Sequence, residues 1–499
     1  MNHIDYLYKP SLALLTDLYQ LTMCQGYYHS GIAHHEAVFH VTFRKNPFKG
    51  GYTLACGMAT VAELLKNFKF AEDDIAYLAT LRGNDNKELF DPKFLKWLAR
   101  MEFACDIHTV HDGCVVFPHE PLVRVQGPLY QCQLIETLLL NTINFESLIA
   151  TKAARICQAA QGEPVLEFGL RRAQGIDGAL SASRAAYIGG CSATSNVLAG
   201  KMFGIPVKGT HAHSWIMCFD DESVAFEEYA NAMPNNCVFL VDTYDTLEGV
   251  KKAIEAGKWM RGLGHKMVGI RLDSGDLAYL SIAARKLLDD AGFSDAVIVA
   301  SNDLDEHIIE SLKAQGAPIG VWGVGTKLIT AYDQPALGGV YKLSALRAHP
   351  REAWQYKVKL SEQIEKTSTP GILQVVRVYK ANQAYADIIY SKDDPPMVFL
   401  DEDDVTIIDI FDSTRRKTIQ HHDFDTSYEL LQPLFEKGKL ISKHYVTNPE
   451  FIREQAARSL SKFDGGVKRF VNPHNYPVGL EQNLYEKKQA LIMKLRGHE

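Results

Sequence analysis

The spacing of hydrophobic positions changes several times along this 499-residue chain, and each change predicts a different kind of element. Residues 16–31, TDLYQLTMCQGYYHSG, predict a helix that begins at an Asp or Thr cap. The alternation in residues 36–47, EAVFHVTFRKNP, predicts an antiparallel strand with Arg44 and Lys45 at its end. Helical spacing and short alternating runs follow up to about residue 127, so we expect this first segment to be α+β.

The hydrophobic pattern changes after residue 127. Residues 131–160 have apolar positions three and four apart, which predicts a long helix. Short apolar strands then alternate with helices about six times, which indicates a parallel α/β core. An irregular TIM-like barrel suits this number of units better than an open doubly wound sheet, which remains the alternative. The predicted strands and their ends read PVLEFG, PVKGT, CVFLVDTY, KMVGIRLDSG, AVIVASND and IGVWGVGT.

From GGVYKLSALRAH onward the pattern again predicts antiparallel strands, and the tail from about residue 426 is expected to be mostly helix and loop. We therefore predict three segments: 1–127, an α/β barrel over 128–345 that carries the active site, and 346–499. The strand-rich first and third segments are expected to pack together as one discontinuous α+β domain.

Composition narrows the classes of function. The net charge of −7 is spread along the chain and provides no basic surface for nucleic acid. The nine cysteines include no CxxC pair, which favours reduced thiols in a cytoplasmic protein. The first twenty residues do not resemble a signal peptide and no apolar run is long enough for a membrane span. We expect a cytoplasmic protein without a membrane or nucleic-acid partner.

Chemistry is expected at the carboxyl ends of the predicted strands, because barrel active sites lie there. The glycine-rich GVGT end could bind phosphate through backbone N–H groups, and an arginine fork could bind a carboxylate or phosphate. Paired aspartates could hold Mg²⁺ or ribose hydroxyls, although an ion pair or a helix cap explains such residues equally well. The strand ends supply Phe168, Arg171, Arg172, Thr210, His211, His213, Ser214, Asp242, Asp245, Arg271, Asp273, Ser274, Asp276, Ser301, Asn302, Asp303, Gly323, Gly325 and Thr326.

The segment VKGTHAHSWIM, residues 207–217, places two histidines one residue apart, which is a common metal-binding pattern. A barrel metal site needs further histidine ligands from later strand ends, but His265 precedes its predicted strand and His307 lies on a predicted helix. The pattern therefore favours a single histidine that acts as a base or a nucleophile. A metal-dependent hydrolase that uses His211 and His213 remains the alternative from a different class.

Six motifs occur here in the order found in nicotinate phosphoribosyltransferases, and the chain resembles that family from about residue 12 to 345 and more loosely beyond. The motifs are TDLYQLTM, FRKNPF, EFGLRRAQG, GGCSATSNVLAGKMFGIPVKGTHAHSW, IRLDSGDL and GVGTKLITAYDQPALGGVYKL. The resemblance implies a type II phosphoribosyltransferase fold that works as a head-to-tail homodimer. It also implies NAD biosynthesis or salvage from nicotinate and phosphoribosyl pyrophosphate, which yield nicotinate mononucleotide and pyrophosphate. ATP hydrolysis is coupled to this reaction, and Mg²⁺ is the implied cofactor.

The resemblance also implies a role for individual residues. His213, in GTHAHS, matches the histidine that accepts the ATP γ-phosphoryl group, whereas His211 receives no role. Tyr19, Phe168, Arg171, Thr210 and Arg271 match the nicotinate pocket, with Tyr19 from the partner subunit. The residues that match contacts to phosphoribosyl pyrophosphate or its Mg²⁺ are Asp273, Ser274, Gly325, Thr326, Arg44 and Lys45.

Two related substrates stay open as alternatives. Nicotinamide-using enzymes carry an acidic residue near the position of Ser195, and the absence of a carboxylate there favours nicotinate. Quinolinate enzymes are much shorter than this chain. A non-catalytic nucleotide-binding relative is disfavoured because His213, Arg271 and Thr326 are all present.

Overall fold

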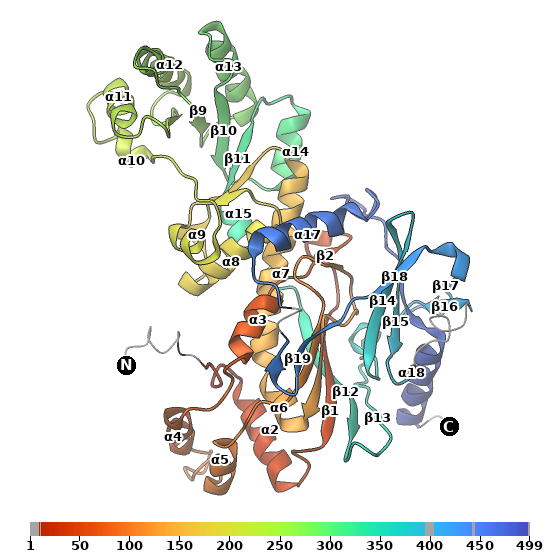
Figure 1. Cartoon of the computed structure of the whole chain (residues 1–499). Helices are drawn as coiled ribbons and strands as arrows, with labels where there is room; N and C mark the ends of the chain where they lie inside the picture. Colours follow the sequence, from red (N-terminus) through yellow and green to blue (C-terminus); the bar gives the residue numbers. More distant parts are fainter. Residues whose placement is uncertain (1–8, 10, 395–403, 442–444, 498–499) are drawn as a thin grey trace. The chain divides into compact units, whose positions relative to one another are not determined.

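The computed structural model describes residues 9, 11–394, 404–441 and 445–497 and shows a mixed α/β protein with two compact units (Figure 1). Unit 1 comprises Met1–Ser147, Ala336–Thr447 and Arg458–Glu499. Unit 2 comprises Leu148–Pro335 and Asn448–Ala457. The division of the chain at residues 127 and 345 stays a prediction. None of the helices described is both long and apolar enough to cross a membrane.

Unit 1 contains a seven-stranded sheet in which strands from both halves of the chain are neighbours, in the order β13-β12-β1-β5-β3-β19-β20. Its interior strand β1 pairs antiparallel with both β12 and β5. The strand bounds are β1 Glu36–Phe43, β3 Asp106–Thr109, β5 Val123–Pro128, β12 Gly339–Arg347, β13 Gln355–Tyr356, β19 Gln432–Glu436 and β20 Lys439–Leu440.

The predicted first helix and strand are confirmed, and their packing explains their pattern. Helix α2, Leu18–His29, follows Asp17, whose backbone N–H donates to Gln20 Oε1 at 2.9 Å. Most of β1 is buried on both faces rather than on alternate residues. Phe39, for example, stacks on Tyr341 of β12 with ring centroids 4.8 Å apart. The strand therefore lies in the middle of a core and not at a solvent-facing surface.

A second, six-stranded sheet of unit 1 has the order β17-β16-β21-β15-β14-β18, and helix α18 contacts β16 and β21. The remaining bounds are β2 Thr53–Leu54, β4 Val115–Val116, β14 Leu373–Lys380, β15 Gln383–Ser391, β16 Val405–Ile408, β17 Arg416–Ile419, β18 Thr426–Glu429, β21 Val478–Glu481, α3 Met58–Leu65, α4 Glu72–Thr80, α5 Pro92–Leu98, α6 Leu129–Leu134 and α18 Gln482–Leu495, with short 3₁₀ turns at Pro47–Lys49, Ile364–Lys366 and His421–Asp423.

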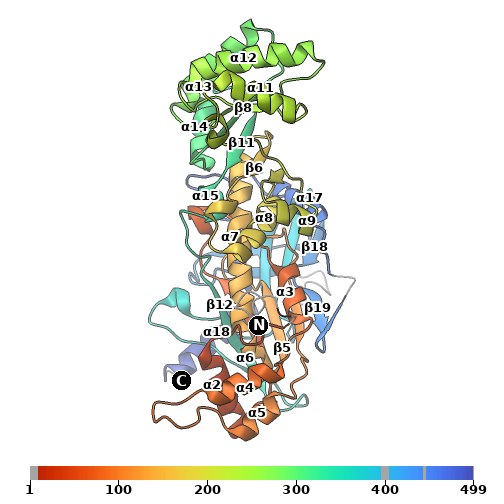
Figure 2. The ribbon, with the colours of Figure 1, turned by 90° about the vertical axis from the view of Figure 1, so that its left-hand side faces the viewer.

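The parallel core predicted for the middle of the chain is confirmed in unit 2. Its sheet has the order β7-β6-β11-β10-β9-β8, and every neighbouring pair is parallel. Helices α12, α13 and α14 lie along the outside of these strands (Figures 1 and 2). No ladder joins β7 to β8 among the described residues, so closure into a barrel stays a prediction.

The strands of unit 2 are β6 Val165–Glu167, β7 Ala193–Thr194, β8 Val238–Leu240, β9 Gly269–Leu272, β10 Val297–Asn302 and β11 Val321–Val324. Its helices are α8 Ile176–Ile188, α9 Val197–Phe203, α10 His213–Ile216, α11 Glu222–Ala232, α12 Thr246–Gly262, α13 Leu277–Asp290, α14 Glu306–Ala314 and α15 Thr326–Ile329, with a 3₁₀ turn at Leu170–Arg172. Helices α7 Glu136–Ala159 and α17 Pro449–Ser461 each include residues of both units.

One local prediction is wrong, and another is incomplete. The segment PVKGT does not form a strand, since only Val207 makes an isolated parallel bridge to Thr194. Pro206 has no N–H to donate to a ladder, which explains why pairing stops there. The tail after residue 426, predicted to be mostly helix and loop, contains α17 and α18, and it begins with the strands β18, β19 and β20, which the pattern did not predict. These are short strands at or near sheet edges, whose residues show little alternation.

Candidate active site

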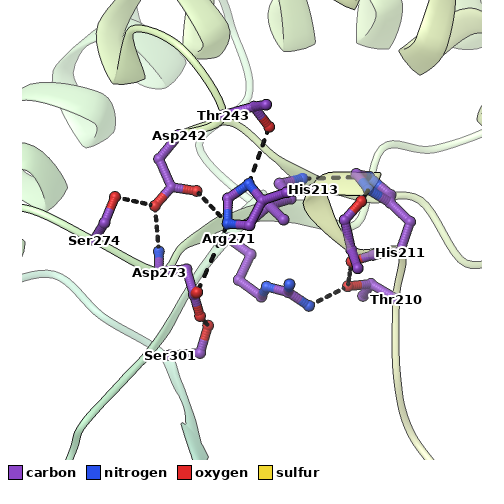
Figure 3. Close-up of polar contacts among 11 residues, drawn as sticks. Thr210, His211, His213, Asp242, Thr243, Arg271, Asp273, Ser274 and Ser301 are labelled. Atoms are coloured by element: carbon purple, nitrogen blue, oxygen red, sulfur yellow. Dashed lines mark hydrogen bonds and ion pairs between the residues drawn. The ribbon is translucent and has the colours of Figure 1, made fainter. Parts of the chain in front are cut away.

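The carboxyl ends of three neighbouring strands in unit 2 bring acidic and hydroxyl side chains together. Asp242 follows β8, and its Oδ2 accepts hydrogen bonds from the Asp273 backbone N–H at 2.8 Å and Ser274 Oγ at 2.6 Å. Ser301, near the end of β10, donates to Asp273 Oδ1 at 2.5 Å (Figure 3). Because β8, β9 and β10 are parallel, their ends meet at one edge and form this network.

His213 is the first residue of helix α10 and faces this network. Its Nδ1 lies 3.1 Å from Thr243 Oγ1, so one ring nitrogen has a hydroxyl partner. Its Nε2 lies 3.7 Å from Asp273 Oδ2 and 4.0 Å from Asp242 Oδ1 (Figure 3). The side chain remains 38% exposed. The imidazole is therefore oriented through Nδ1 while Nε2 stays accessible beside two carboxylates.

Asp242 connects the acidic network to this histidine. Its carboxylate is completely buried, yet Oδ1 has no hydrogen-bond partner among the described residues. A buried carboxylate oxygen without a donor is costly, and a catalytic role or a bound ion is one explanation for it. Since Oδ1 is also the oxygen nearest to His213 Nε2, it is available to accept a proton or a cation at that position.

Arg271 provides the cationic part of the same edge. Its Nη1 donates to Thr210 Oγ1 at 2.7 Å, and its Nε is buried without a partner among the described residues. Burial lowers the pKa of Arg271, which Asp273 and Asp242 partly oppose and Arg171 reinforces. No ion pair within 4.0 Å joins Arg271 to a carboxylate in the described part of the chain. The guanidinium is therefore available for an anionic ligand.

Phe168 and the glycines of β11 form an adjoining wall. The Phe168 N–H donates to Val324 O at 2.8 Å, which joins β6 to β11. A Cβ on Gly323 would lie 2.8 Å from the Phe168 ring, so only glycine allows the ring this position. Gly325 and Thr326 follow directly, at the start of the short helix α15. The predicted aromatic and glycine-rich residues thus lie together at the strand ends.

Unlike His213, His211 is buried and contacts neighbouring elements of the fold. Burial lowers its pKa to about 4, so the ring is neutral near pH 7. Its Nε2 accepts from the Leu240 N–H at 3.4 Å, and its ring lies edge-on to Tyr229. That nitrogen is not free for a metal, and the described residues contain no cluster of three or more His, Cys, Asp or Glu side chains suited to one. The two histidines do not form a metal pair.

Three comparisons with known proteins point to one family. Family models for the N-terminal domain, the family core and the C-terminal domain of nicotinate phosphoribosyltransferase match residues 14–144, 164–386 and 373–488. A nicotinate phosphoribosyltransferase of Bacillus subtilis is 43% identical over 99% of this chain and 98% of its own length. The chain belongs to the nicotinate phosphoribosyltransferase family.

Other relatives agree with this assignment. A Caenorhabditis elegans nicotinate phosphoribosyltransferase is 36% identical over 97% of this chain and 94% of its own. The crystal structure of human nicotinic acid phosphoribosyltransferase superposes with a TM-score of 0.80 at 29% identity, covering 95% of this chain and 99% of that one. A nicotinate-nucleotide pyrophosphorylase of Pyrococcus furiosus, at 21% identity and a TM-score of 0.65 over 90% of this chain and 96% of its own, shares the fold.

In this family member, the residues proposed from the sequence fall into two sets. Phe168, Arg171, Thr210, His213, Arg271, Asp273, Ser274, Gly325 and Thr326 all lie in unit 2, whereas Tyr19, Arg44 and Lys45 lie in unit 1. Arg171 is exposed in a 3₁₀ turn, and its charge acts on Arg271. Tyr19 is 46% exposed on α2. Burial, followed by the nearby Glu136 carboxylate, raises its pKa to about 12.

Arg44 lines a basic cavity of unit 1, which we name the β1-end pocket. Its polar lining comes from cations and hydroxyls, together with one acid, Glu365. Lys45 is exposed, and its Nζ lies 3.9 Å from Glu365 Oε2. The residues that define the pocket here are Arg44, His119, Lys342, Lys366, Thr367 and Thr369.

The sequence assigned no role to several residues of the observed site. Asp242 and Ser301 were visible as strand-end residues, but nothing in the sequence joined them to His213 and Asp273. Thr243 was not singled out, although it directly follows Asp242 in VDTYDT. Asp276 is now explained as the N-cap of α13, since it accepts from the Tyr279 N–H at 3.0 Å. The cap and the site residue are therefore different aspartates of DSGD.

Proposed function

We propose that this chain catalyses ATP-coupled transfer of a phosphoribosyl group to nicotinate and that His213 carries a phosphoryl group during the cycle. The reaction joins nicotinate and phosphoribosyl pyrophosphate, hydrolyses ATP, and releases nicotinate mononucleotide, pyrophosphate, ADP and phosphate. It serves NAD biosynthesis or salvage. The observation that carries the proposal is the close grouping of His213, Thr243, Asp242 and Asp273 beside the Arg271–Thr210 pair.

Arg271 and Thr210 fit the nicotinate carboxylate. A buried guanidinium with an unpartnered Nε can form a charge-assisted hydrogen bond to a carboxylate, and the adjacent hydroxyl can donate a second one. The Phe168 ring beside Gly323 supplies a flat apolar surface for the pyridine ring. Arg171 adds positive charge to the same region. Tyr19, from a second copy of the chain, would cover the opposite ring face.

The contacts of His213 fit a phosphoryl acceptor. With Nδ1–H donating to Thr243 Oγ1, the ring presents the Nε2 lone pair for attack on the ATP γ-phosphorus. The N–P bond forms as the bond to ADP breaks, and water later releases phosphate from the histidine. The phosphoryl group would change substrate affinity and product release, whereas positioning and charge stabilisation would drive displacement at the anomeric carbon.

Magnesium fits this donor set through the substrates rather than through a protein cage. Asp273 and Asp242 are hard oxygen donors, and Asp242 Oδ1 is buried without a partner among the described residues. Two carboxylates with substrate phosphates are typical Mg²⁺ ligands. When bound, the ion would neutralise phosphate charge beside these acids. Ser274, Gly325 and Thr326 would bind the ribose or phosphate of phosphoribosyl pyrophosphate.

We also propose a head-to-tail homodimer in which unit 1 of one copy completes the site in unit 2 of the other. The β1-end pocket supports this assignment because Arg44, Lys342 and Lys366 give it positive charge suited to phosphate. Lys45 would assist from the exposed end of the same strand. We assign the pocket to the phosphate or pyrophosphate part of the substrates.

Two alternative functions receive less support. The position of Ser195 has no carboxylate, and the nearby Glu167 already accepts from Ser183 Oγ at 2.9 Å and Thr194 Oγ1 at 2.6 Å. Recognition of a carboxamide by a free acid there is therefore disfavoured, and so is nicotinamide. A metal-dependent hydrolase is disfavoured because His211 Nε2 is occupied by the Leu240 N–H.

The test is a comparison of nicotinate and nicotinamide as substrates, each with and without ATP, for the unmodified enzyme and for Arg271→Ala. We expect nicotinate to be preferred and ATP to stimulate its use. Arg271→Ala should raise the KM for nicotinate by about 10- to 100-fold, since a hydrogen bond to a charged group contributes about 1.5–3 kcal/mol. An unchanged KM in a folded variant would remove Arg271 from the carboxylate pocket.

A further inference from the structure

Lys488 of helix α18 is a buried lysine without an acidic partner. Its side chain is 2% exposed, and no carboxylate of the described residues pairs with it. Its Nζ lies 3.4 Å from Thr369 Oγ1 and 5.7 Å from the centre of the Phe411 ring. The preceding residue, Lys487, is exposed and forms an ion pair with Asp394 at the surface. An unpaired buried ammonium is unfavourable unless an anion approaches it.

The ammonium of Lys488 contacts a residue that lines the β1-end pocket. Thr369, its hydrogen-bond partner, lines that pocket. His119, another lining residue, has a pKa lowered to about 4 by burial and then by the charges of Lys488 and Arg44. Lys488 therefore lies behind the pocket wall, close enough to add its charge to the cations that line it.

We propose that Lys488 is the buried cation of the β1-end pocket and positions Thr369 for a phosphate-class anion bound there. The inference deepens the proposed function, on which the assignment of the pocket to phosphate or pyrophosphate rests. Lys488 does not touch the reacting atoms and is a positioning residue. The positive charge of Lys488 offsets the negative charge of the bound anion, and the anion in turn offsets the cost of the buried ammonium.

The charge state of Lys488 links anion binding to pH. Burial lowers the pKa of Lys488 to about 8. A bound anion stabilises the ammonium and raises that pKa, so the anion affinity is highest below pH 8 and falls as the pH rises through it. His119, on which the charges of Lys488, Arg44 and Asp409 all act, has a pKa lowered to about 4, so it is neutral at pH 7 and does not titrate in this range. Lys342, whose pKa burial also lowers, contributes in the same direction.

The main test measures binding of inorganic pyrophosphate to the full-length protein by calorimetry near neutral pH. Lys488→Met keeps the apolar length of the side chain and removes its charge. We expect this variant to bind pyrophosphate about tenfold or more weakly, as the loss of one charge-assisted interaction predicts. Lys487→Met is the matched control, since it removes a lysine charge from the adjacent exposed position, and its affinity should equal that of the unmodified protein.

Arg44→Gln separates this inference from the proposed function. If Arg44→Gln weakens pyrophosphate binding while a folded Lys488→Met does not, the pocket binds the anion but the role of Lys488 is wrong. If neither substitution weakens binding, the assignment of the pocket itself is wrong. Thermal unfolding without pyrophosphate provides the folding control, and Lys488→Met should not lower the melting temperature because it removes an unpaired buried charge.

The pH profile of the unmodified protein keeps the inference testable if Lys488→Met does not fold. Inorganic sulfate is the probe, because it remains a dianion from neutral to alkaline pH. We expect its affinity to fall as pH rises through about 8, and to do so equally in Lys487→Met. A flat profile from about pH 7 to pH 9 would overturn the assignment.

Discussion

His211 and His213 are separated by one residue but have ring nitrogens with different partners. His211 is buried and neutral, and its Nε2 accepts from a strand backbone N–H. His213 keeps 38% of its side chain exposed and presents Nε2 beside two carboxylates. His211 therefore anchors the loop of residues 210–213 to β8 and α11. This anchoring fixes the positions of Thr210 and His213, which lie before and after His211 in the loop.

At the scale of the residue, we predict that His213→Ala abolishes the stimulation of nicotinate use by ATP. The variant should also not acquire the acid-labile phosphate that ATP would leave on the protein. Without an imidazole there is no acceptor for the phosphoryl group. Radiolabelled ATP and a steady-state assay with and without ATP measure the two effects. Ser214→Ala is the control, since Ser214 is the exposed neighbour in α10, and it should retain both. Full ATP stimulation in His213→Ala would exclude the phosphohistidine.

At the scale of the element, helix α12 packs tightly on the end of β8. A Cβ added to Gly249 would lie 2.0 Å from Val241 O, a backbone atom that cannot move aside cheaply. Gly262, at the other end of the same helix, has nothing within 4 Å of such a Cβ. The helical period predicted α12, but only the packed structure distinguishes these two glycines. Val241 immediately precedes Asp242, so this packing also supports the site.

We therefore predict opposite effects of one substitution at two positions of α12. Gly249→Ala should lower the free energy of unfolding by about 1–3 kcal/mol, the usual cost of overpacking. Gly262→Ala should leave it unchanged or raise it by up to about 1 kcal/mol, because alanine favours the helix. Urea denaturation of the two variants compares them directly. Equal effects at both positions would mean that α12 does not contact β8 as described.

At the scale of the whole molecule, the residues that we assign to one reaction belong to two compact units. His213 and Arg271 lie in unit 2, whereas Tyr19 and Arg44 lie in unit 1. A head-to-tail dimer would let each site take one set from each copy, and a closed two-fold assembly would then contain two equivalent sites.

We predict that two variants with impaired ATP-stimulated activity restore that activity when they are produced together. His213→Ala and Arg44→Gln each impair both sites of their own dimer, but a mixed dimer contains one site with native residues from both copies. Random mixing should recover about a quarter of the native activity, since half of the dimers are mixed and half of their sites are intact. Co-expression with different affinity tags isolates the mixed dimer. No recovery in a purified mixed dimer would exclude the shared site.

Much of the fold and part of the site could be predicted from the sequence because they are encoded locally. The 3.6-residue period identified the helices, and apolar runs with polar ends identified most strands of the parallel core. Arg271 stood out because it lies near the end of one of those strands, now β9, whereas Thr210 and His213 stood out through the motif GTHAHS after PVKGT, which is not a strand. The wrong prediction at PVKGT and the missed short strands after residue 426 fall where local signals are weak.

The tertiary structure alone decided which of these strand-end residues meet. The parallel register of β8, β9 and β10 brings Asp242, Asp273 and Ser301 to one edge, although more than twenty residues separate each from the next. The packed structure also shows that Asp276 caps a helix and that His211 is a buried neutral residue. In the same way, it brings Lys488 next to a pocket that distant segments form. Sequence spacing carries backbone preference and periodicity, whereas burial and distances between side chains arise only when remote segments pack.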